Sequence, residues 1–374
     1  EANEAAIKAS YRFHLGKRKT ILHASNSFHG KLVATGSISS PLKNYKFPNV
    51  LRKMEFKVND FSGLEKIEKK YKKNCDVFAL IIEPYSASTT TAVNEKFLKK
   101  IVSFCKKNKI ILIYDEIYTG WCKTGTIFYF QRYKNIYPDI LTTSKSLGGG
   151  KASIAACIMN KKIFNKVYGN IIDATLHSTT FNGFGEECVT AIEALKILKR
   201  EKFNQKAKKI ENHINSKFKI LNRDHSSFNM RLKGVGGIQK IYFDLDKITS
   251  KFISNKEFKK KYQKLYFFRK RLFEIALIDT LYFKYDIFAY HSLNSLVISP
   301  SLIIKKKQID YVFSCLSKIF KSEPEEIIRN YLKRQINKNW YNNNNLIWIN
   351  NNLYFNYIFW YAVLTIKNRL NFSK

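Results

Sequence analysis

The residues best suited to chemistry are Lys145, Asp115 and Glu83, each of which follows a short, largely apolar run. A lysine amine adds to an aldehyde to form a Schiff base. A carboxylate such as that of Asp115 keeps a pyridine nitrogen protonated. Together, these two groups are what a protein contributes to chemistry based on pyridoxal phosphate (PLP), whose ring is an electron sink. Taken singly, the lysine also fits an ordinary surface position and the aspartate a helix cap.

The elements that must position these residues are strands buried on both faces of a sheet. Val77–Ile82 and Ile110–Tyr114 are continuous apolar runs, and Ile140–Thr143 is a third strand of the same kind. Residues 94–108 carry apolar positions at helical spacing. Connections of this length predict a parallel α/β sheet, which places its ligands at the carboxyl ends of the strands.

Two further segments offer what a PLP site needs besides the lysine and the carboxylate. Ser27–Gly30 places an aromatic ring and a glycine after the strand-like Thr20–His23, and His177–Gly183 offers hydroxyl groups in a turn. An aromatic face would hold the pyridine ring, and hydroxyl or backbone donors would hold the phosphate.

Composition narrows the class of protein. The chain has 374 residues and is 45% hydrophobic, which excludes intrinsic disorder and allows a sizeable core. The net charge of +37 is mostly lysine spread among asparagines, isoleucines and tyrosines, so we favour a biased base composition over a nucleic-acid partner as its cause. Six scattered cysteines, without CxxC or histidine clusters, predict reduced thiols in the cytoplasm and no metal site.

The chain divides by composition into three parts. We predict a large domain over residues 1–200, a smaller α+β domain over 201–338 and an Asn- and aromatic-rich tail over 339–374. The apolar run Leu353–Ile366 in the tail is shorter than the roughly 18 residues needed to span a bilayer. We therefore interpret the tail as a non-homologous extension, with a membrane-surface anchor as the alternative. Because the chain opens directly into a helix, we expect it to be cut from something longer.

Seven motifs follow one another in an order that resembles a known family. They are EANEAAIK (1–8), SFHGK (27–31), IIEP (81–84), IYDEIYTGWCKTG (113–125), YPDILTTSKSLGGG (137–150), HSTTFNG (177–183) and a weaker LVISPSLII (296–304). Over roughly residues 1–325 the chain resembles the class III aminotransferases, which include acetylornithine, ornithine and 4-aminobutyrate aminotransferases. The resemblance implies the PLP-dependent fold type I, with a mostly parallel α/β large domain and a smaller α+β C-terminal domain.

The resemblance also implies roles for individual residues. Lys145 would be the Schiff-base lysine and proton shuttle, and Asp115 would pair with the pyridine nitrogen. Phe28 and Ile117 would pack on the two faces of the cofactor ring. Thr180 would bind the phosphate across the interface of a homodimer.

Other residues would order the active site or bind the substrate. Glu83 would order the site, and Lys31 stands where many members have a carboxylate-binding arginine. Val297 occupies the position where the family usually has a second arginine. The segment Ser86–Thr90 and Tyr118 also differ from the family pattern. By the resemblance, the family's phosphate-binding turn at a helix N-terminus would precede Glu1, so we expect this chain to lack it. The substrate side therefore differs from the family more than the cofactor side does.

The resemblance implies transfer of an amino group from a primary amine on a terminal carbon to a 2-oxo acid. The enzyme would be a PLP-dependent homodimer in the cytoplasm, without nucleic-acid partners. A PLP-dependent aminomutase shares the same cofactor residues, and release of a free oxo acid distinguishes the two. A truncated, inactive remnant of such an enzyme is the third alternative.

Overall fold

A computed structural model describes residues 1–40, 50–72, 75–244, 263–292 and 294–341, so most of the predicted tail lies outside the described residues. The chain forms two compact units. The first consists of Glu1–Glu211, Gly234–Ile238 and Pro300–Ile303, and the second of Asn212–Lys233, Gln239–Ser299 and Ile304–Lys374.

The first unit is built on a six-stranded sheet with the order β2-β1-β3-β6-β7-β8. All neighbouring strands pair in parallel except β7 and β8, which are antiparallel. The strands are β1 (Thr20–Ala24), β2 (Arg52–Phe56), β3 (Val77–Ile82), β6 (Ile111–Asp115), β7 (Ile140–Thr143) and β8 (Ala156–Met159). A separate two-stranded ribbon joins β4 (Tyr85–Ser86) to β5 (Thr91–Ala92). The predicted parallel α/β sheet is thereby confirmed.

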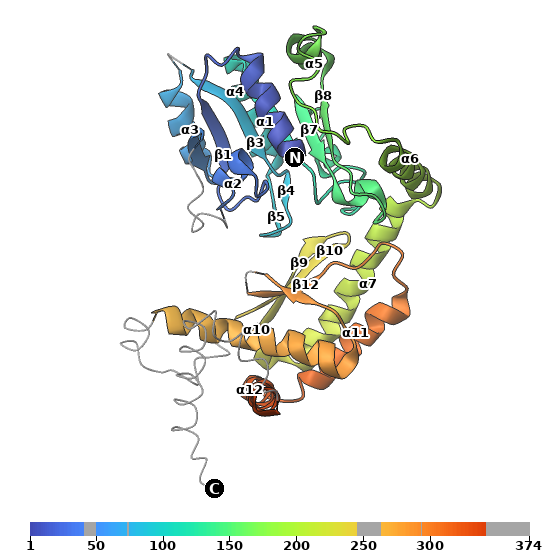
Figure 1. The fold of residues 1–374 in the computed structure, drawn as a ribbon. Helices are drawn as coiled ribbons and strands as arrows, with labels where there is room; N and C mark the ends of the chain where they lie inside the picture. Colours follow the sequence, from blue (N-terminus) through green and yellow to red (C-terminus); the bar gives the residue numbers. More distant parts are fainter. Residues whose placement is uncertain (41–49, 73–74, 245–262, 293, 342–374) are drawn as a thin grey trace. The chain divides into compact units, whose positions relative to one another are not determined.

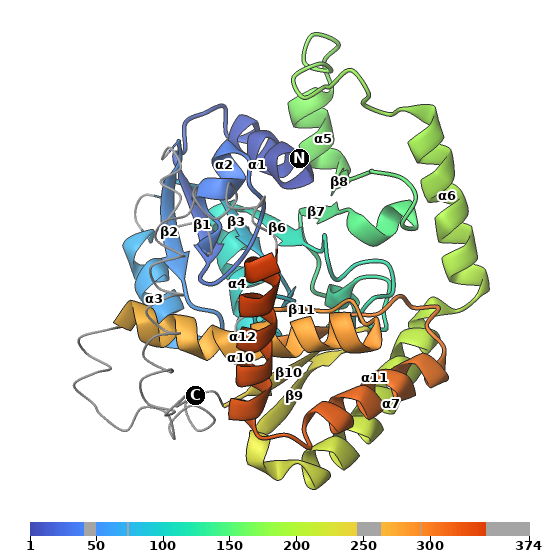
Figure 2. The same ribbon diagram turned by 60° about the horizontal axis from the view of Figure 1, so that its bottom comes forward.

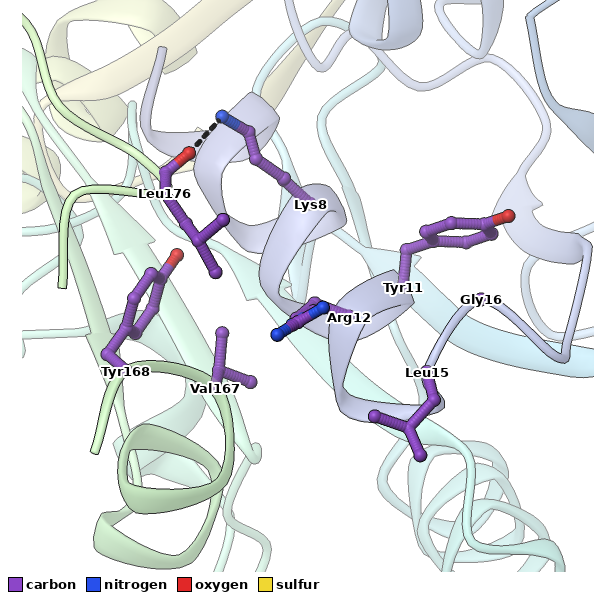
Figure 3. A pocket seen from close by; sticks show the side chains of 8 residues that line it. All are labelled: Lys8, Tyr11, Arg12, Leu15, Gly16, Val167, Tyr168 and Leu176. Carbon is purple, nitrogen blue, oxygen red and sulfur yellow. Dashed lines mark hydrogen bonds between the residues drawn. The ribbon is translucent and has the colours of Figure 1, made fainter. Parts of the chain in front are cut away.

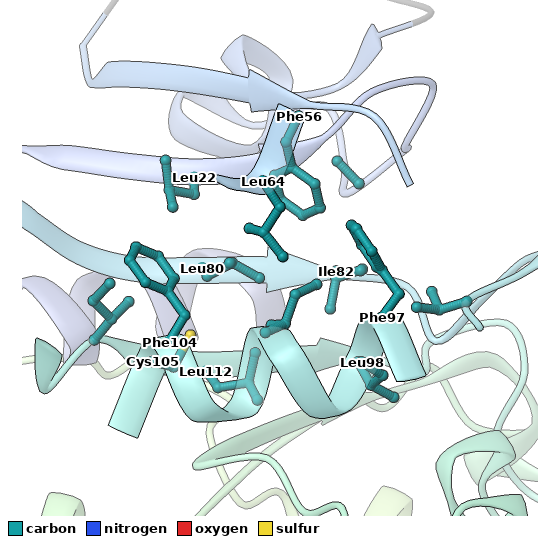
Figure 4. Close-up of a cluster of buried hydrophobic side chains, with 14 of the residues drawn as sticks. Leu22, Phe56, Leu64, Leu80, Ile82, Phe97, Leu98, Phe104, Cys105 and Leu112 are labelled. Atoms are coloured by element: carbon teal, nitrogen blue, oxygen red, sulfur yellow. The ribbon is translucent and has the colours of Figure 1, made fainter. Parts of the chain in front are cut away.

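Helices cover both faces of this sheet (Figure 1). They are α1 (Ala2–Phe13), α2 (Val33–Ser37), α3 (Phe61–Lys70), α4 (Glu95–Asn108) and α5 (Lys161–Tyr168). Helix α6 (Gly185–Arg200) contacts the turn Lys145–Gly148 instead. One hydrophobic cluster packs α3 and α4 against the sheet through side chains such as Leu80, Leu112 and Phe97 (Figure 4). A second cluster packs α1 and α5 against the other face through Ile81 and Ile113. Successive strand residues thus face opposite helix layers, which explains the continuous apolar runs.

Local sequence signals mark where several helices begin. The carboxylate of Asp60 accepts the N–H of Gly63 at the start of α3. Asn94 accepts the N–H of Lys96 before α4, and Asn160 accepts the N–H of Ile163 before α5. Each side chain satisfies one of the backbone donors that a helix N-terminus leaves unpaired.

The second unit contains most of a four-stranded sheet with the order β11-β12-β10-β9. Its strands are β9 (Met230–Val235), β10 (Ile238–Phe243), β11 (Tyr290–His291) and β12 (Ser295–Ile298), and its helices are most of α7 (Phe203–Asp224), α10 (Gln263–Tyr285), α11 (Lys306–Ile319) and α12 (Pro324–Tyr341). Helices α7 and α11 lie side by side (Figure 2), joined where Asp310 accepts from His213 and Lys217. In the described part of the chain, no helix is long and apolar enough to cross a bilayer.

Candidate active site

The carboxyl ends of β3, β6 and β7 bring the three predicted residues to one edge of the sheet. Ile82 pairs with Tyr114, and Asp115 pairs with Thr142, so the three neighbouring parallel strands end together. Glu83 directly follows β3, and Asp115 is the last residue of β6. Lys145 lies two residues beyond β7, and the charges of both carboxylates act on its ammonium group.

The carboxylate of Asp115 is held by three donors. One oxygen, Oδ2, lies 2.6 Å from Nδ2 of Asn3 and 2.8 Å from Nδ1 of His29. The other oxygen, Oδ1, accepts the backbone N–H of Ile117 at 3.1 Å. Because a carboxylate only accepts hydrogen bonds, Nδ1 of His29 must carry the proton. Asp115 is thereby fixed in orientation, and Oδ1, which accepts one hydrogen bond here, has the capacity to accept a second.

Helix α1 contributes to this network through Asn3, a residue to which the sequence analysis assigned no role. Asn3 is buried; its Nδ2 also donates to the carbonyl of His29 at 2.8 Å, and its Oδ1 accepts from Thr142 Oγ1 at 2.6 Å. Asn3, Ile7 and Ser10 share the buried face of α1. A polar side chain on the apolar face of a helix is the signal that points to such a position.

Lys145 occupies a special backbone position directly after β7. It begins a short 3-10 turn over Lys145–Gly148 and has a left-handed backbone with φ 44°. Its Nζ lies 4.9 Å from the centre of the Tyr118 ring. Burial lowers the pKa of Lys145, while the carboxylates of Asp115 and Glu83 act in the opposite direction. A lowered pKa increases the share of neutral amine, the form that attacks a carbonyl carbon.

Glu83 connects the sheet edge to the loop that carries Phe28. Its Oε1 accepts the backbone N–H of Phe28 at 2.9 Å, and burial raises the pKa of Glu83. The Phe28 side chain is 38% exposed and follows β1 in the chain. The predicted loop after β1 therefore presents a partly open aromatic ring.

The neighbouring Glu116 is fully buried and serves as an anchor. Its carboxylate accepts from Thr119 Oγ1 at 2.6 Å and from the backbone N–H groups of Tyr129 and Phe130, both at 2.8 Å. Burial raises the pKa of Glu116 to about 7, although these hydrogen bonds oppose the shift. This carboxylate ties the segment after β6 to the sheet.

Two predicted residues lie apart from these contacts. Lys31 is exposed just before α2, and Thr180 is exposed in the segment before α6. The roles expected of them, and of Ile117 beside Asp115, remain predictions.

The residues at the sheet edge fit the reactive part of PLP. A protonated pyridine nitrogen needs a fixed acceptor, which Asp115 offers through Oδ1. An aldehyde needs an amine of lowered pKa, which Lys145 supplies. The ring needs a flat apolar neighbour, and the partly open side chain of Phe28 is one.

Comparisons with known proteins show the family to which the chain belongs. The family described as "Aminotransferase class-III" matches residues 1–320, and the chain belongs to this family. It is 31% identical over 268 residues to an acetylornithine aminotransferase of Prochlorococcus marinus, covering 70% of this chain and 63% of the relative. It is 29% identical over 281 residues to an adenosylmethionine-8-amino-7-oxononanoate aminotransferase of Buchnera aphidicola, covering 70% and 65%. The chain thus spans less than two thirds of the length of these curated relatives.

Among solved structures, the chain resembles an ornithine aminotransferase of Toxoplasma gondii. The TM-score is 0.69 at 22% identity, and the similarity covers 87% of this chain and 71% of the other. At this identity the likeness concerns the fold. It supports the assignment to fold type I made from the motifs.

Proposed function

We propose that this chain is a PLP-dependent aminotransferase that transfers an amino group from a primary amine, on a terminal carbon, to a 2-oxo acid. The observation that carries the proposal is that Lys145 and Asp115 lie at the same sheet edge, where His29 and Asn3 hold the Asp115 carboxylate and its charge acts on Lys145. Membership of the class III family supports the same reaction. PLP, when bound, supplies an electron sink for breaking the C–H bond next to nitrogen.

Each side chain of the site would have a separate role in the reaction. Asp115 would hold a proton on the pyridine nitrogen, and hydrogen bonds from His29 and Asn3 would keep its carboxylate oriented. The neutral amine of Lys145 would attach the cofactor and then accept and return a proton at Nζ. Phe28 and Ile117 would enclose the ring from its two faces.

The roles of Lys31 and Thr180 would depend on a bound substrate and on a second copy of the chain. We propose that Lys31 binds a substrate carboxylate as a point charge, and that Thr180 binds the cofactor phosphate of a second copy. Around Thr180 the chain exposes large apolar side chains: Ile171 is 88%, Ile172 79% and Phe181 74% exposed. Such a patch fits an interface between two copies of the chain.

Mass measurement by light scattering tests the dimer. We expect twice the chain mass, and we expect the Phe181→Glu variant to shift toward the monomer. A monomeric wild type at micromolar concentration would refute the dimer.

We also propose a cytoplasmic location, which the six unpaired cysteine thiols support.

Cofactor binding and product release test the reaction. We expect the purified chain incubated with PLP to gain a long-wavelength absorption band that Lys145→Ala lacks. The exposed Lys161→Ala, on α5, is the matched control and should keep the band. With an amine donor, release of a free oxo acid supports the aminotransferase, and isomerised product without release indicates an aminomutase. No band in the wild type would refute the proposal.

A further inference from the structure

The amine of Lys145 lies over an aromatic ring. Its Nζ is 4.9 Å from the centre of the Tyr118 ring. Within the described part of the chain, no hydrogen bond and no ion pair reaches this nitrogen. An ammonium group at this distance is attracted by the negative charge on the face of the ring. The ring is therefore the contact that holds the amine.

The two carboxylates at the same sheet edge are bound to other groups. Three donors hold the carboxylate of Asp115 at the end of β6. Oε1 of Glu83 accepts the backbone N–H of Phe28 at 2.9 Å. Their charges favour the ammonium form of Lys145, whereas burial favours the neutral amine. The carboxylates thus act on Lys145 through their field and leave its position to the ring.

Three further charged residues lie around the turn that Lys145 begins. Lys123, Lys151 and Glu193 of α6 line the same cavity as Lys145. Glu193 pairs with Lys196 at 3.3 Å, and Nζ of Lys123 donates to a backbone carbonyl. The pKa of Lys145 responds to burial, Asp115 and Glu83 and not to these three residues.

Tyr118 is itself held in place on both sides. The backbone N–H of Ile117 donates to Asp115 at 3.1 Å, and Oγ1 of Thr119 donates to Glu116 at 2.6 Å. The Tyr118 side chain packs against a buried cluster within the first unit, made of Tyr85, Tyr129, Val235 and Ile238. A ring fixed in this way can define where a flexible lysine side chain ends.

Other lysines near rings in the first unit have an acceptor. Figure 3 shows a cavity between α1 and α5, where Lys8 donates to the carbonyl of Leu176 at 2.7 Å. Lys19 lies 5.6 Å from the centre of the Tyr11 ring, and its Nζ also donates to the Tyr11 hydroxyl at 3.1 Å. Lys145 differs from both, because its described contact is with the ring face.

We propose that Tyr118 is a positioning residue whose ring holds the amine of Lys145, stabilises its ammonium form and thereby sets the pH above which Lys145 reacts with an aldehyde. The inference rests on the proposed function, in which Lys145 attaches PLP, and adds a control on the protonation of that amine. The ring acts in the same direction as the two carboxylates and offsets part of the effect of burial. Tyr118 is also one of the residues at which the sequence differs from the family pattern.

Competitive acetylation of the full chain without cofactor measures the protonation of Lys145 directly. The chain is treated with a trace of acetic anhydride at a series of pH values, and the peptide that contains Lys145 is quantified by mass spectrometry. The exposed Lys161 in the same sample is the internal standard. We expect Tyr118→Leu to lower the midpoint of the Lys145 profile by about 0.5–1.5 pH units, because the ammonium form loses its ring.

Two matched variants separate the ring from the fold. Tyr118→Phe keeps the ring face and should keep the wild-type midpoint. Tyr137→Leu removes a tyrosine that is 67% exposed and should also leave the Lys145 profile unchanged. Circular dichroism checks each variant for folding, and Tyr118→Met replaces Tyr118→Leu if the leucine variant does not fold.

The rate at which the PLP absorption band appears is the second readout. Its dependence on pH should shift with the acetylation midpoint in Tyr118→Leu and stay unchanged in Tyr118→Phe. Equal midpoints for the wild type and Tyr118→Leu, or a lowered midpoint in Tyr118→Phe, would overturn the role of the ring. Failure of the proposed function is distinct: there the wild type forms no PLP band, while acetylation of Lys145 still depends on the ring.

Discussion

Replacing Asn3 by alanine probes the network that orients Asp115. In the wild type, Asn3 Nδ2 donates to the Asp115 carboxylate at 2.6 Å and to the His29 carbonyl at 2.8 Å. Its Oδ1 accepts from Thr142 Oγ1 at 2.6 Å. The variant removes all three hydrogen bonds at a position that is 1% exposed, so water cannot readily replace them.

The expected loss follows from these contacts. Two hydrogen bonds between neutral groups contribute about 1 kcal/mol each, and the one to the carboxylate contributes about 1.5–3 kcal/mol. The sum is about 3–5 kcal/mol of the free energy of unfolding, a large part of the 5–15 kcal/mol that is usual for a folded domain. Asn3→Asp keeps the shape but sets a second carboxylate against Asp115. We therefore expect it to destabilise the fold more at pH 7 than at pH 4.

Urea unfolding followed by circular dichroism measures this loss, and PLP titration measures its effect on the site. The control is Asn165→Ala, an exposed asparagine within α5, which should change stability by less than about 0.5 kcal/mol. An Asn3→Ala variant within about 1 kcal/mol of the wild type, with unchanged PLP affinity, would refute the reasoning that this side chain holds Asp115.

Three further predictions concern residues of the first unit. Burial and the neighbouring His29 lower the pKa of His23 to about 4, below its usual value near 6.5. The unfolded chain therefore binds more protons between these values, and stability falls as pH drops from about 6.5 to about 4, by about 3 kcal/mol for a shift of this size. His23→Gln should remove that part of the pH dependence in urea titrations, and an unchanged pH profile would contradict the assignment. A methyl group on Gly236, at φ 57°, would lie 2.5 Å from the carbonyl oxygen of Lys123. Gly236→Ala should therefore lower the midpoint of thermal unfolding clearly more than Gly16→Ala, whose added carbon meets only ordinary contacts; equal effects would count against a tight approach there. The Arg18 guanidinium donates to the carbonyls of Val77 at 2.8 Å and Asn108 at 2.9 Å. Arg18→Met should cost about 1.5–3 kcal/mol in urea unfolding, and an undiminished midpoint would show that these bonds are not stabilising.

The sheet was predictable from the sequence because its strands are buried on both faces. The run Val77–Ile82 is apolar throughout, and it coincides with β3. The meeting of Glu83, Asp115 and Lys145 at one edge followed from the parallel topology, since parallel strands end on the same side. Asp115 proved to be the last residue of β6 rather than the residue after it.

The supporting contacts were not predictable in the same way. Asn3 and Asp115 lie far apart in the chain, and no spacing rule joins a helix residue to the end of a strand that follows so much later. His29 was given no catalytic role from the sequence, whereas its Nδ1 lies 2.8 Å from Asp115 Oδ2. The left-handed backbones of Trp121 and Cys122 could not be predicted from the sequence either, because neither residue type favours that conformation.

Covalent trapping tests the central claim most directly, namely that Lys145 is the amine that attaches PLP. The chain is incubated with PLP, reduced with borohydride, digested, and analysed by mass spectrometry. The account predicts one pyridoxyl group per chain, on the peptide that contains Lys145, and none on that site in Lys145→Ala. Because the chain carries many lysines, scattered labelling is the competing result. A label spread over exposed lysines, or located on a different single lysine, would contradict the account.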